Sequence, residues 1–246
     1  MTAHTETVWD LENLARAERL ADWIFEQFRP HVRGDVAEIG AGIGTYSERI
    51  RAVGVDDLLL VEPDPACAAR LRTSFSHVAE ETLPEAPSLR PGERDFVVAL
   101  NVIEHTADDH AAVAAMARAL RPGGVLSLLV PAHPRLYGRL DSLYGHHRRY
   151  TRARLRDLVE EAGLEVLDLY RFNALGILGW MAKNRTREPS LDPRSLRAFE
   201  RVLPLYRTLV EDRFRPPVGL SLIVHARRGP EGPVARAGKS SREGSA

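Results

Sequence analysis

The first half of the chain alternates short apolar runs with helical segments, and this pattern restricts the fold more than any other feature. Predominantly apolar runs occupy residues 36–40, 58–64, 95–101 and 124–132. Short strands that alternate with helices indicate βαβ units around a buried parallel sheet. Such units have right-handed connections, and ligands gather at the carboxyl ends of their strands. We therefore expect an α/β protein whose binding site lies at one edge of the sheet.

The rest of the chain completes this pattern. Thr151 is a good N-cap for a helix that ends at Gly163. The other expected helices are 10–29, 45–54, 65–75, 111–120 and a helix from Pro193 to Leu209, and further strands are expected at 164–172 and 217–228, with an irregular, partly apolar stretch at 173–190.

Length and composition indicate a single domain. The chain has 246 residues, of which 44% are apolar and 28% charged, as is usual for one large globular α/β domain. We expect this domain to cover residues 1–228. Residues 229–246 are rich in Gly, Pro, Ser, Arg and Ala and lack an apolar pattern, which predicts a disordered tail.

The charge balance and the cysteine content exclude several classes of protein. Lys+Arg and Asp+Glu both total 34, whereas a general nucleic-acid binder needs a basic excess. Cys67 is the only cysteine, so neither an intrachain disulfide nor a CxxC metal site can form. The polar N-terminus lacks the apolar core of a signal peptide, and no apolar run is long enough for a transmembrane helix. We expect a cytoplasmic protein.

A glycine-rich turn follows the first predicted strand. In EIGAGIGTYS (38–47), Gly40, Gly42 and Gly44 lie between a strand and a helix. Without Cβ atoms they allow a tight turn and let a ligand lie against the backbone. Alone, this pattern also fits a tight turn that binds nothing.

Two acidic residues narrow the choice of ligand. Glu62 ends the second predicted strand, 22 residues after Gly40, where a carboxylate accepts hydrogen bonds from both ribose hydroxyls of an adenosine-containing cofactor. Glu38 places a second carboxylate beside the turn, where it would repel a pyrophosphate. The pair therefore favours a nucleoside with a cationic sulfonium over NAD.

Four motifs in this order resemble those of the class I S-adenosylmethionine-dependent methyltransferases. EIGAGIG (38–44) is similar to their first motif and LLLVEPD (58–64) to their second. ALNVIEH (99–105) is similar to the stretch after their fourth strand, and LRPGGVL (120–126) to the turn before their fifth. The segment 131–150 looks like that of a bacterial branch that acts on small molecules.

The resemblance implies a fold. It implies a Rossmann-like, doubly wound, mostly parallel seven-stranded sheet with an antiparallel last strand and helices on both faces. Residues 34–131 would form the cofactor half, and 132–228 the substrate-side loop and C-terminal half. In that family the last strand inserts beside the sixth, and the predicted strands at 164–172 and 217–228 can supply this pair.

The resemblance also implies which residues bind S-adenosyl-L-methionine. Glu38 would lie near the methionine end of the cofactor and Glu62 at the ribose, while Glu80, Glu81 and Leu83 are alternatives for the adenine. The implied cofactor residues are Glu38, Gly40, Gly42, Gly44, Glu62, Pro63, Asp64, Glu81, Leu83, Asn101 and Val102.

The loop after the fifth predicted strand carries candidates for acceptor chemistry. A histidine near neutral pKa suits removal of a hydroxyl proton, and His133 and His146 are the preferred candidates, with His105 third. Arg148 and Arg149 suit an acidic group on the acceptor. The candidate acceptor contacts are Tyr137, Asp141, His147, Arg148, Arg149, Tyr150 and Trp180.

Two other interpretations of this loop stay open. The first is structural: Arg149 pairs with Asp141 or Glu104, while Tyr150 packs and Thr151 caps the next helix. The second is a metal site formed by the acceptor-side residues His133, Asp141, His146 and His147. Their spacing matches no tight ligand signature, so we expect no metal.

These features together predict an enzyme. The expected reaction is methyl transfer to a small molecule, with oxygen favoured over carbon or nitrogen, and a natural product, quinone, sugar or lipid-linked metabolite as acceptor. A cyclisation or rearrangement that uses the same cofactor site is the alternative. A nicotinamide dehydrogenase is a third possibility, which Glu38 disfavours. A non-catalytic binding protein is a fourth, and its function would survive a mutation of Glu62. We expect a monomer or homodimer without a nucleic-acid partner.

Overall fold

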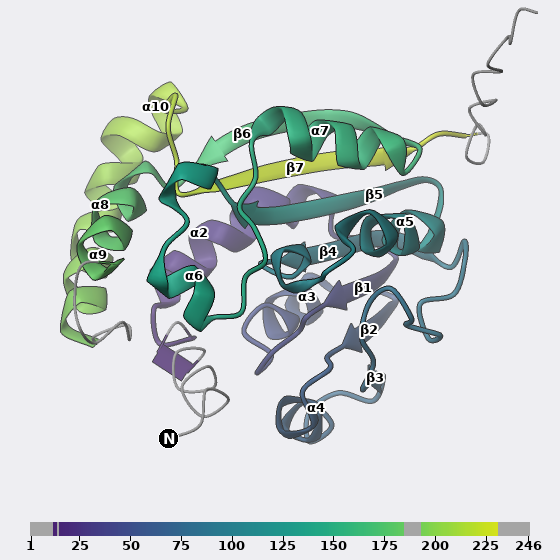
Figure 1. The fold of residues 1–246 in the computed structure, drawn as a ribbon. Coiled ribbons are helices and arrows are strands. Elements are labelled where there is room, and N and C mark those ends of the chain that lie inside the picture. Colours follow the sequence, from purple (N-terminus) through teal and green to yellow (C-terminus); the bar gives the residue numbers. More distant parts are fainter. Residues whose placement is uncertain (1–11, 14, 185–192, 231–246) are drawn as a thin grey trace, which may run out of the picture.

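A seven-stranded sheet forms the centre of the molecule, with the strand order β3-β2-β1-β4-β5-β7-β6 (Figure 1). The structure is a computed structural model that describes residues 12–13, 15–184 and 193–230. Strands β1 to β5 are parallel, and β7 inserts antiparallel between β5 and β6. This order confirms the predicted sheet. The strands are β1 (Asp35–Ile39), β2 (Asp57–Val61), β3 (Val78–Ala79), β4 (Arg94–Leu100), β5 (Leu120–Pro131), β6 (Leu164–Phe172) and β7 (Ser221–Arg228).

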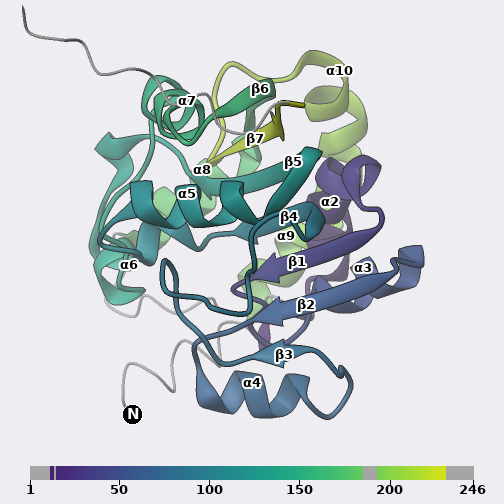
Figure 2. The same cartoon turned by 90° about the vertical axis from the view of Figure 1, so that its right-hand side faces the viewer.

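Helices cover both faces of the sheet, as predicted. Helices α5 (Asp109–Ala119) and α7 (Arg152–Glu161) lie on one face, and α2 (Glu18–Phe28) and α3 (Ser47–Val53) lie on the other (Figure 2). Helix α4 (Pro65–Leu71) packs Leu71 with Leu60 of β2.

Local signals in the sequence account for several helix ends. The Asp64 side chain accepts a hydrogen bond from the Cys67 backbone N–H at 2.8 Å and so caps α4. The Thr151 hydroxyl accepts from the Arg154 N–H at 3.2 Å and caps α7, as predicted. Gly54 and Gly163 follow α3 and α7 with φ of 85° and 82°, a conformation that glycine adopts without strain.

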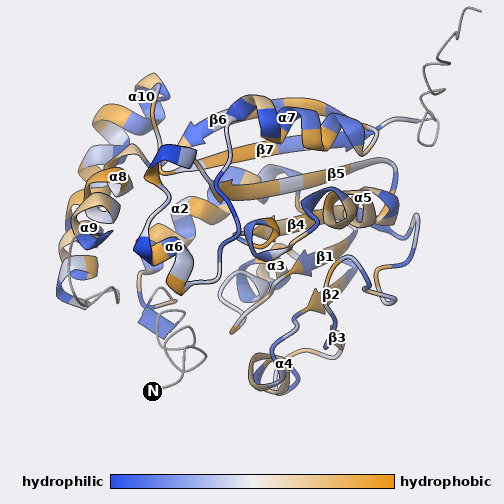
Figure 3. Ribbon diagram, in the orientation of Figure 1, coloured by the Kyte–Doolittle hydropathy of each residue, from blue (hydrophilic) through white to orange (hydrophobic). Residues whose placement is uncertain are grey.

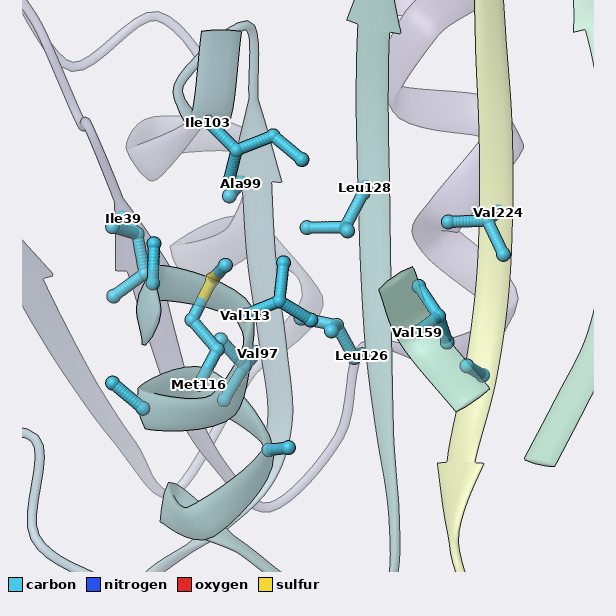
Figure 4. Close-up of a cluster of buried hydrophobic side chains, with 14 of the residues drawn as sticks. Ile39, Val97, Ala99, Ile103, Val113, Met116, Leu126, Leu128, Val159 and Val224 are labelled. Atoms are coloured by element: carbon cyan, nitrogen blue, oxygen red, sulfur yellow. The ribbon is translucent and has the colours of Figure 1, made fainter. Parts of the chain in front are cut away.

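The largest core lies between the sheet and the α5–α7 face. Strand residues such as Val97 and Leu126 meet Val113 and Met116 of α5, and all four are fully buried (Figure 4). Burying each such side chain contributes about 1.5–3 kcal/mol relative to exposure. The strands β5 and β7 that cross this core are largely hydrophobic (Figure 3). The core holds the carboxyl ends of the parallel strands at a fixed edge.

Helix α2 packs against elements from the C-terminal part of the chain, β6 and α9. Trp23 of α2 is fully buried against Phe172 of β6, with ring centroids 4.2 Å apart. No side chain caps α2 at Ala17. Instead, the Glu200 carboxylate accepts hydrogen bonds from the backbone N–H groups of Arg19 at 3.0 Å and Leu20 at 2.8 Å. A residue from a distant helix therefore satisfies donors that the start of a helix leaves free.

The prediction of irregular structure at 173–190 was wrong for its first part. Residues Ala174–Asn184 form helix α8. Asn173 begins this helix, because its side-chain oxygen accepts from the Gly176 N–H at 2.8 Å. Gly176 and Gly179 suggested a loop, but the asparagine cap and the apolar residues between the glycines outweigh them. The remainder, 185–192, lies outside the described residues.

Other boundaries differ by a few residues. The loop after β5 contains the short helices η3 (Pro134–Leu136) and α6 (Arg139–Leu143), and short turns η1 (Arg29–His31) and η2 (Ile103–His105) precede β1 and follow β4. The C-terminal helix α9 (Pro193–Tyr206) continues into a π-helical turn, η4 (Arg207–Glu211), and α10 (Asp212–Phe214).

The structure describes only part of the predicted tail and of the predicted first helix. Residues 231–246 of the predicted tail at 229–246 lie outside the described residues, as do residues 10, 11 and 14 of the predicted first helix. Over the described ranges, no helix combines the length and the apolar character needed to span a membrane.

Candidate functional site

The glycine turn after β1 packs directly against the segment after β4. Gly40, Gly42 and Gly44 have φ of 70°, 56° and 90°. The Gly40 N–H donates to the Val61 carbonyl at 2.7 Å. A Cβ added to Gly40 would lie 2.5 Å from Cγ2 of Val102. Glycine is therefore required at this position both by the backbone conformation and by the close approach of a neighbouring side chain.

Glu62 ties this turn to the end of β2. One carboxylate oxygen accepts from the Gly42 N–H at 2.7 Å, and the other accepts from the Asp64 N–H at 2.9 Å. Burial raises the pKa of Glu62, and the two backbone hydrogen bonds oppose this rise. Each carboxylate oxygen has two lone pairs, so each can still accept from a ligand hydroxyl. This arrangement fits the predicted contact with the two hydroxyls of a ribose.

Glu38 is a buried carboxyl next to the same turn. Only 3% of its surface is exposed, and the Ser47 hydroxyl donates to it at 2.5 Å. Burial raises its pKa to about 8, the Ser47 hydrogen bond lowers it, and the charge of Glu62 raises it further. A nearby cation would favour the ionised form. The electrostatics of this edge therefore suit a cationic ligand and disfavour an anion.

Asn101 and Val102, two further predicted cofactor contacts, lie directly after β4 at the same edge. Asn101 has a positive φ of 53°, which asparagine tolerates better than most residues. Its backbone N–H donates to the Leu129 carbonyl of β5 at 2.8 Å. The Asn101 side chain is exposed at the strand-end edge. The structure thus brings together the predicted residues of the glycine turn, β2 and β4.

The predicted adenine contacts have partners of their own. The Glu81 carboxylate accepts from the Ser88 backbone N–H at 3.1 Å and from its hydroxyl at 2.5 Å. Glu80 pairs with Arg72 at 3.1 Å, and the Leu83 side chain is buried in the core. None of these contacts identifies the adenine site, so the adenine contacts stay a prediction.

Asp141 is the centre of the acceptor-side loop. It is fully buried, and its Oδ1 lies 2.9 Å from Nδ1 of His146 and 2.7 Å from Nε of Arg149. Its Oδ2 accepts from the Gly138 N–H at 2.9 Å. Burial alone raises the pKa of Asp141, but the His146 hydrogen bond and the Arg149 charge outweigh it, so the net pKa lies below the usual value. Asp141 is therefore a buried carboxylate that orients its neighbours.

Arg149 braces the loop from the same centre. Besides Asp141, its guanidinium donates to the Ala132 carbonyl at 3.1 Å and stacks over the Trp180 ring at 4.4 Å. Arg149 is 3% exposed, and burial lowers its pKa against the opposing effect of Asp141. Of the two pairings predicted for Arg149, the structure shows the one with Asp141.

Tyr150 and Arg148 hold the loop to α5. The Tyr150 hydroxyl donates to Asp109 at 2.9 Å, and its ring is fully buried. Arg148 pairs with the same Asp109 at 3.0 Å and donates to the Ala107 carbonyl at 2.7 Å. Three of the predicted acceptor contacts are therefore buried and hold the loop in place: Asp141, Arg149 and Tyr150. The other predicted contacts lie nearer the surface.

Helices α6 and α8 lie together at the strand-end edge (Figure 1). The Asn184 side chain accepts from the Leu140 N–H at 3.0 Å, and the Trp180 ring N–H donates to the Leu136 carbonyl at 3.4 Å. Tyr137 is 43% exposed, and its hydroxyl donates to the His146 carbonyl at 2.7 Å. Tyr137, Trp180 and the exposed His147 therefore line the outer part of this loop.

The three predicted catalytic histidines occupy different environments. His133 lies just beyond β5, and its Nε2 is buried without a hydrogen-bond partner among the described residues. Burial lowers the pKa of His133, the charges of Arg171 and Arg149 lower it further, and a hydrogen bond to the Gly219 backbone opposes them. His105 and His146 instead face each other, with ring centroids 4.7 Å apart.

Glu104 is a residue that the sequence reasoning treated only as a pairing partner. It is fully buried, and within the described part of the chain neither carboxyl oxygen has a hydrogen-bond partner. Burial raises its pKa to about 8, while its own backbone N–H, which is close to the carboxyl group but outside hydrogen-bond geometry, and the Arg149 charge lower it. Its position directly before His105 was the only signal in the sequence that it belongs to the site.

Two surface hollows in the described structure lie away from this edge. One lies between Trp23, Phe172 and Arg215, and the other lies beside Asp57 and His77 at the opposite end of β2. Neither contains a residue of the glycine turn or of the loop after β5, so neither is a candidate for the cofactor site.

Comparison with known proteins agrees with this geometry. A family model described as a methyltransferase domain matches residues 13–169. A methyltransferase of Aspergillus fumigatus is 39% identical over 98 residues, which are 38% of this chain and 30% of that protein. A probable S-adenosylmethionine-dependent methyltransferase of Mycolicibacterium smegmatis is 34% identical over 142 residues, 54% of this chain and 53% of that protein. A ubiquinone biosynthesis O-methyltransferase of Erwinia tasmaniensis is 30% identical over 126 residues, 47% of this chain and 52% of that protein.

These matches span between about a third and about half of the relatives' own lengths. Solved structures share the fold over more of the chain. An S-adenosylmethionine-dependent methyltransferase from Mesorhizobium loti has a TM-score of 0.56 at 16% identity, covering 85% of this chain and 98% of that one. A 4+2 cyclase has a TM-score of 0.54 at 17% identity, covering 87% and 81%, so the fold alone does not determine the reaction. The match of the family model over more than half of the chain shows the family: this protein belongs to the methyltransferase domain family.

Proposed function

We propose that this methyltransferase transfers the methyl group to a hydroxyl oxygen of a small-molecule acceptor, with His133 as the general base. The observation that carries this proposal is the unpaired, buried Nε2 of His133 just beyond β5. Buried polar atoms without partners are rare, and an unpaired acceptor is what a base needs before its substrate binds. Amines and carbanions do not require such a base to the same degree.

The environment of His133 keeps the ring neutral. Because Nε2 has no partner, the hydrogen bond to the Gly219 backbone is made through Nδ1. A ring that donates through Nδ1 carries its lone pair on Nε2. Burial and the two nearby arginine charges lower the pKa of His133, which favours this neutral form near pH 7. His146 differs, since its Nδ1 is held by Asp141 and its ring faces His105.

The residues of the cofactor side fit S-adenosyl-L-methionine. Gly40 leaves room at the turn because it has no side chain to meet Val102. The Glu62 carboxylate can still accept hydrogen bonds from hydroxyls, and Glu38 is a buried acid. Together these features match a nucleoside with a cationic end. When bound, the cofactor supplies an activated methyl group on a sulfonium. Glu62 would hold the ribose hydroxyls, and Glu38 would favour the positive end through its charge.

The chain's own residues then account for the remaining chemistry. The protein aligns the acceptor oxygen with the methyl carbon and keeps water out. His133 accepts the hydroxyl proton at Nε2 as the new C–O bond forms and the C–S bond breaks. The products are a methyl ether, S-adenosylhomocysteine and a protonated histidine, which returns its proton to solvent.

The acceptor is proposed to be a natural product, quinone, sugar or lipid-linked metabolite. The balanced charge of the chain does not favour a nucleic acid, and we expect the protein to act as a monomer or homodimer. The name of the Erwinia tasmaniensis relative, a ubiquinone biosynthesis O-methyltransferase, supports an oxygen acceptor of the quinone class.

The test is a product analysis. The protein is incubated with methyl-labelled S-adenosylmethionine and a panel of phenols, quinols and sugars, together with matched amines and methyl ethers as controls. The proposal expects labelled methyl ethers from some hydroxyl compounds and none from the blocked ethers. A product of unchanged mass would instead support rearrangement, and methylation confined to amines would overturn the assignment to oxygen.

A further inference from the structure

Three metal-ligating side chains meet beside the cofactor edge. One potential ligand atom from each of Glu104, His105 and His146 lies within 4.8 Å of the other two. Glu104 and His105 belong to the turn η2 after β4, and His146 comes from the loop after β5. The ends of the neighbouring strands β4 and β5 therefore bring His146 to Glu104 and His105, although His146 is distant from them in the sequence.

Glu104 gives this group a second, independent sign of an absent partner. Its carboxyl group is fully buried, and neither oxygen accepts a hydrogen bond within the described residues. Burial of a carboxyl group without hydrogen bonds is costly even when the group is neutral, because it loses its contacts with water and gains none in the protein. Such a group in a native structure calls for an explanation, and a bound ion is one of the few that fit.

The two histidines are held by partners on their other sides. Nδ1 of His146 lies 2.9 Å from Asp141, which leaves Nε2 free. His105 makes a hydrogen bond to the Tyr144 backbone. Histidines that bind metals almost always use their second nitrogen for a carboxylate or a backbone carbonyl, which fixes the ring. The His147 backbone N–H also donates to the Glu104 carbonyl at 2.7 Å and pins the two segments together.

We propose that Glu104, His105 and His146 form a binding site for one divalent transition-metal ion, with Asp141 orienting His146. Two imidazoles and one carboxylate are a donor set used by Zn²⁺ and by other first-row ions, and three protein ligands leave positions open for a substrate oxygen. Hard ions such as Mg²⁺ favour oxygen donors alone.

The metal site considered from the sequence had other members than this one. It combined His146 with His133, Asp141 and His147. The structure places Asp141 behind His146 instead of in the site, and it supplies Glu104, which no spacing rule had linked to the loop.

The site adjoins the residues predicted to hold the cofactor. Val102, two residues before Glu104, contacts the position of Gly40 in the glycine turn. If the proposed O-methylation holds, on which this step rests, a metal ion here would bind the acceptor oxygen and lower the pKa of its hydroxyl. The proton would then pass to His133 as described, and the oxyanion would attack the methyl carbon.

Titration of the chelator-treated full chain with ZnSO₄ tests the site without any need for activity. Calorimetry is expected to show one Zn²⁺ per chain, and CoCl₂ is expected to give the visible absorption of a protein-bound ion. The substitutions Glu104→Gln and His146→Ala should weaken Zn²⁺ binding by roughly 100-fold or more, and Asp141→Asn by about 10- to 100-fold. His110→Ala, an exposed histidine paired with Glu161, is the matched control and should bind as the parent does.

Binding of S-adenosylhomocysteine to each variant shows that the fold and the cofactor site are intact. Absence of a Zn²⁺ isotherm for the parent, or equal Zn²⁺ affinity in Glu104→Gln and His110→Ala, would overturn the metal site. Methyl transfer to hydroxyl compounds at the full rate without bound metal would overturn the role of the metal in the reaction but leave the proposed function standing. Tight Zn²⁺ binding without any O-methylated product would do the reverse.

Discussion

Glu38 is a buried acid whose protonation couples the cofactor site to stability. Its carboxyl titrates near 4.5 in an unfolded chain and at about 8 in the folded protein, chiefly because of burial. The folded state therefore binds this proton more tightly. The stabilising contribution is complete below pH 4.5 and is lost as the pH rises through about 8. We expect the free energy of unfolding to fall over this window for the parent and to fall less for Glu38→Gln.

Urea unfolding from pH 5 to 9 measures this difference. Glu48→Gln is the control, because Glu48 is an exposed acid of helix α3, next to the Ser47 that binds Glu38, and should leave the pH dependence unchanged. Glu38→Gln should also weaken binding of the sulfonium S-adenosylmethionine more than that of S-adenosylhomocysteine, whose sulfur is uncharged. Equal losses for the two ligands would show that Glu38 does not sense the positive charge.

Gly40 separates two costs that a side chain would impose. In Gly40→Ala the left-handed φ of 70° adds strain, and the new Cβ also meets Val102 at 2.5 Å. Gly92 has a similar φ of 72° with no atom within 4 Å of its Cβ position. Gly92→Ala should therefore cost only the backbone strain, about 1–3 kcal/mol.

Gly40→Ala is expected to destabilise the chain more than Gly92→Ala and to weaken S-adenosylhomocysteine binding. The double variant Gly40→Ala with Val102→Ala should recover part of the stability, because the clash is removed but the strain is not. Urea unfolding and calorimetry give both quantities. A double variant no more stable than Gly40→Ala would contradict the packing argument.

At the scale of elements, helix α8 shows what the sequence pattern could not reveal. Its two glycines and short apolar runs favoured a loop, while the decisive feature was the Asn173 side chain, which accepts from the Gly176 N–H at 2.8 Å. An asparagine before an apolar stretch is a weak signal because asparagine is as common in turns as in caps. The long strands and the helices with glycine ends were predictable, since burial on both faces and a terminal glycine leave clear patterns.

The cap of α8 leads to a prediction. Asn173 has a φ of 61°, so Asn173→Ala loses the cap and also places alanine in a left-handed conformation. Loss of a cap to alanine costs about 0.5–2 kcal/mol, whereas glycine in its place costs only a few tenths. We expect Asn173→Ala to lower the free energy of unfolding clearly more than Asn173→Gly. Thermal and urea unfolding measure the order, and the reverse order would mean that the left-handed backbone at position 173 does not penalise alanine.

At the scale of the whole molecule, the cofactor half was more predictable than the acceptor half. Three parallel strands end directly before the glycine turn, Glu62 and Asn101. The carboxyl ends of parallel strands lie at one edge of the sheet, so these residues were expected to lie together. The acceptor loop folds on contacts between distant residues, such as Arg149 with Asp141 and Tyr150 with Asp109. Glu104 could not be recognised from the sequence, because the absence of a partner for a buried group is visible only after the chain has folded.

The two halves also make separable contributions to the proposed reaction, and His133 tests this separation. His133→Gln keeps a polar side chain of similar size but provides no base. We expect it to reduce the turnover number for a hydroxyl acceptor by about 100- to 10,000-fold, the usual contribution of general-base catalysis. Binding of S-adenosylhomocysteine should be unchanged, because the proposed cofactor site is built from the glycine turn, β2 and β4. Glu62→Gln should show the opposite pattern, with weaker binding of S-adenosylhomocysteine.

The pH dependence of the rate completes this test, because it reports the ionisation of the base itself. Burial holds the pKa of His133 below 6.5, so the base is neutral at pH 7 and gains a proton only in more acidic solution. The parent rate should therefore be flat near neutral pH and fall below 6.5 as His133 is protonated. This acidic limb should be absent from the residual activity of His133→Gln. His77→Gln, a change at the opposite end of β2, is the control and should keep both the rate and the limb. An acidic limb that persists in His133→Gln would assign the base to another group and leave His133 a residue that only shapes the loop.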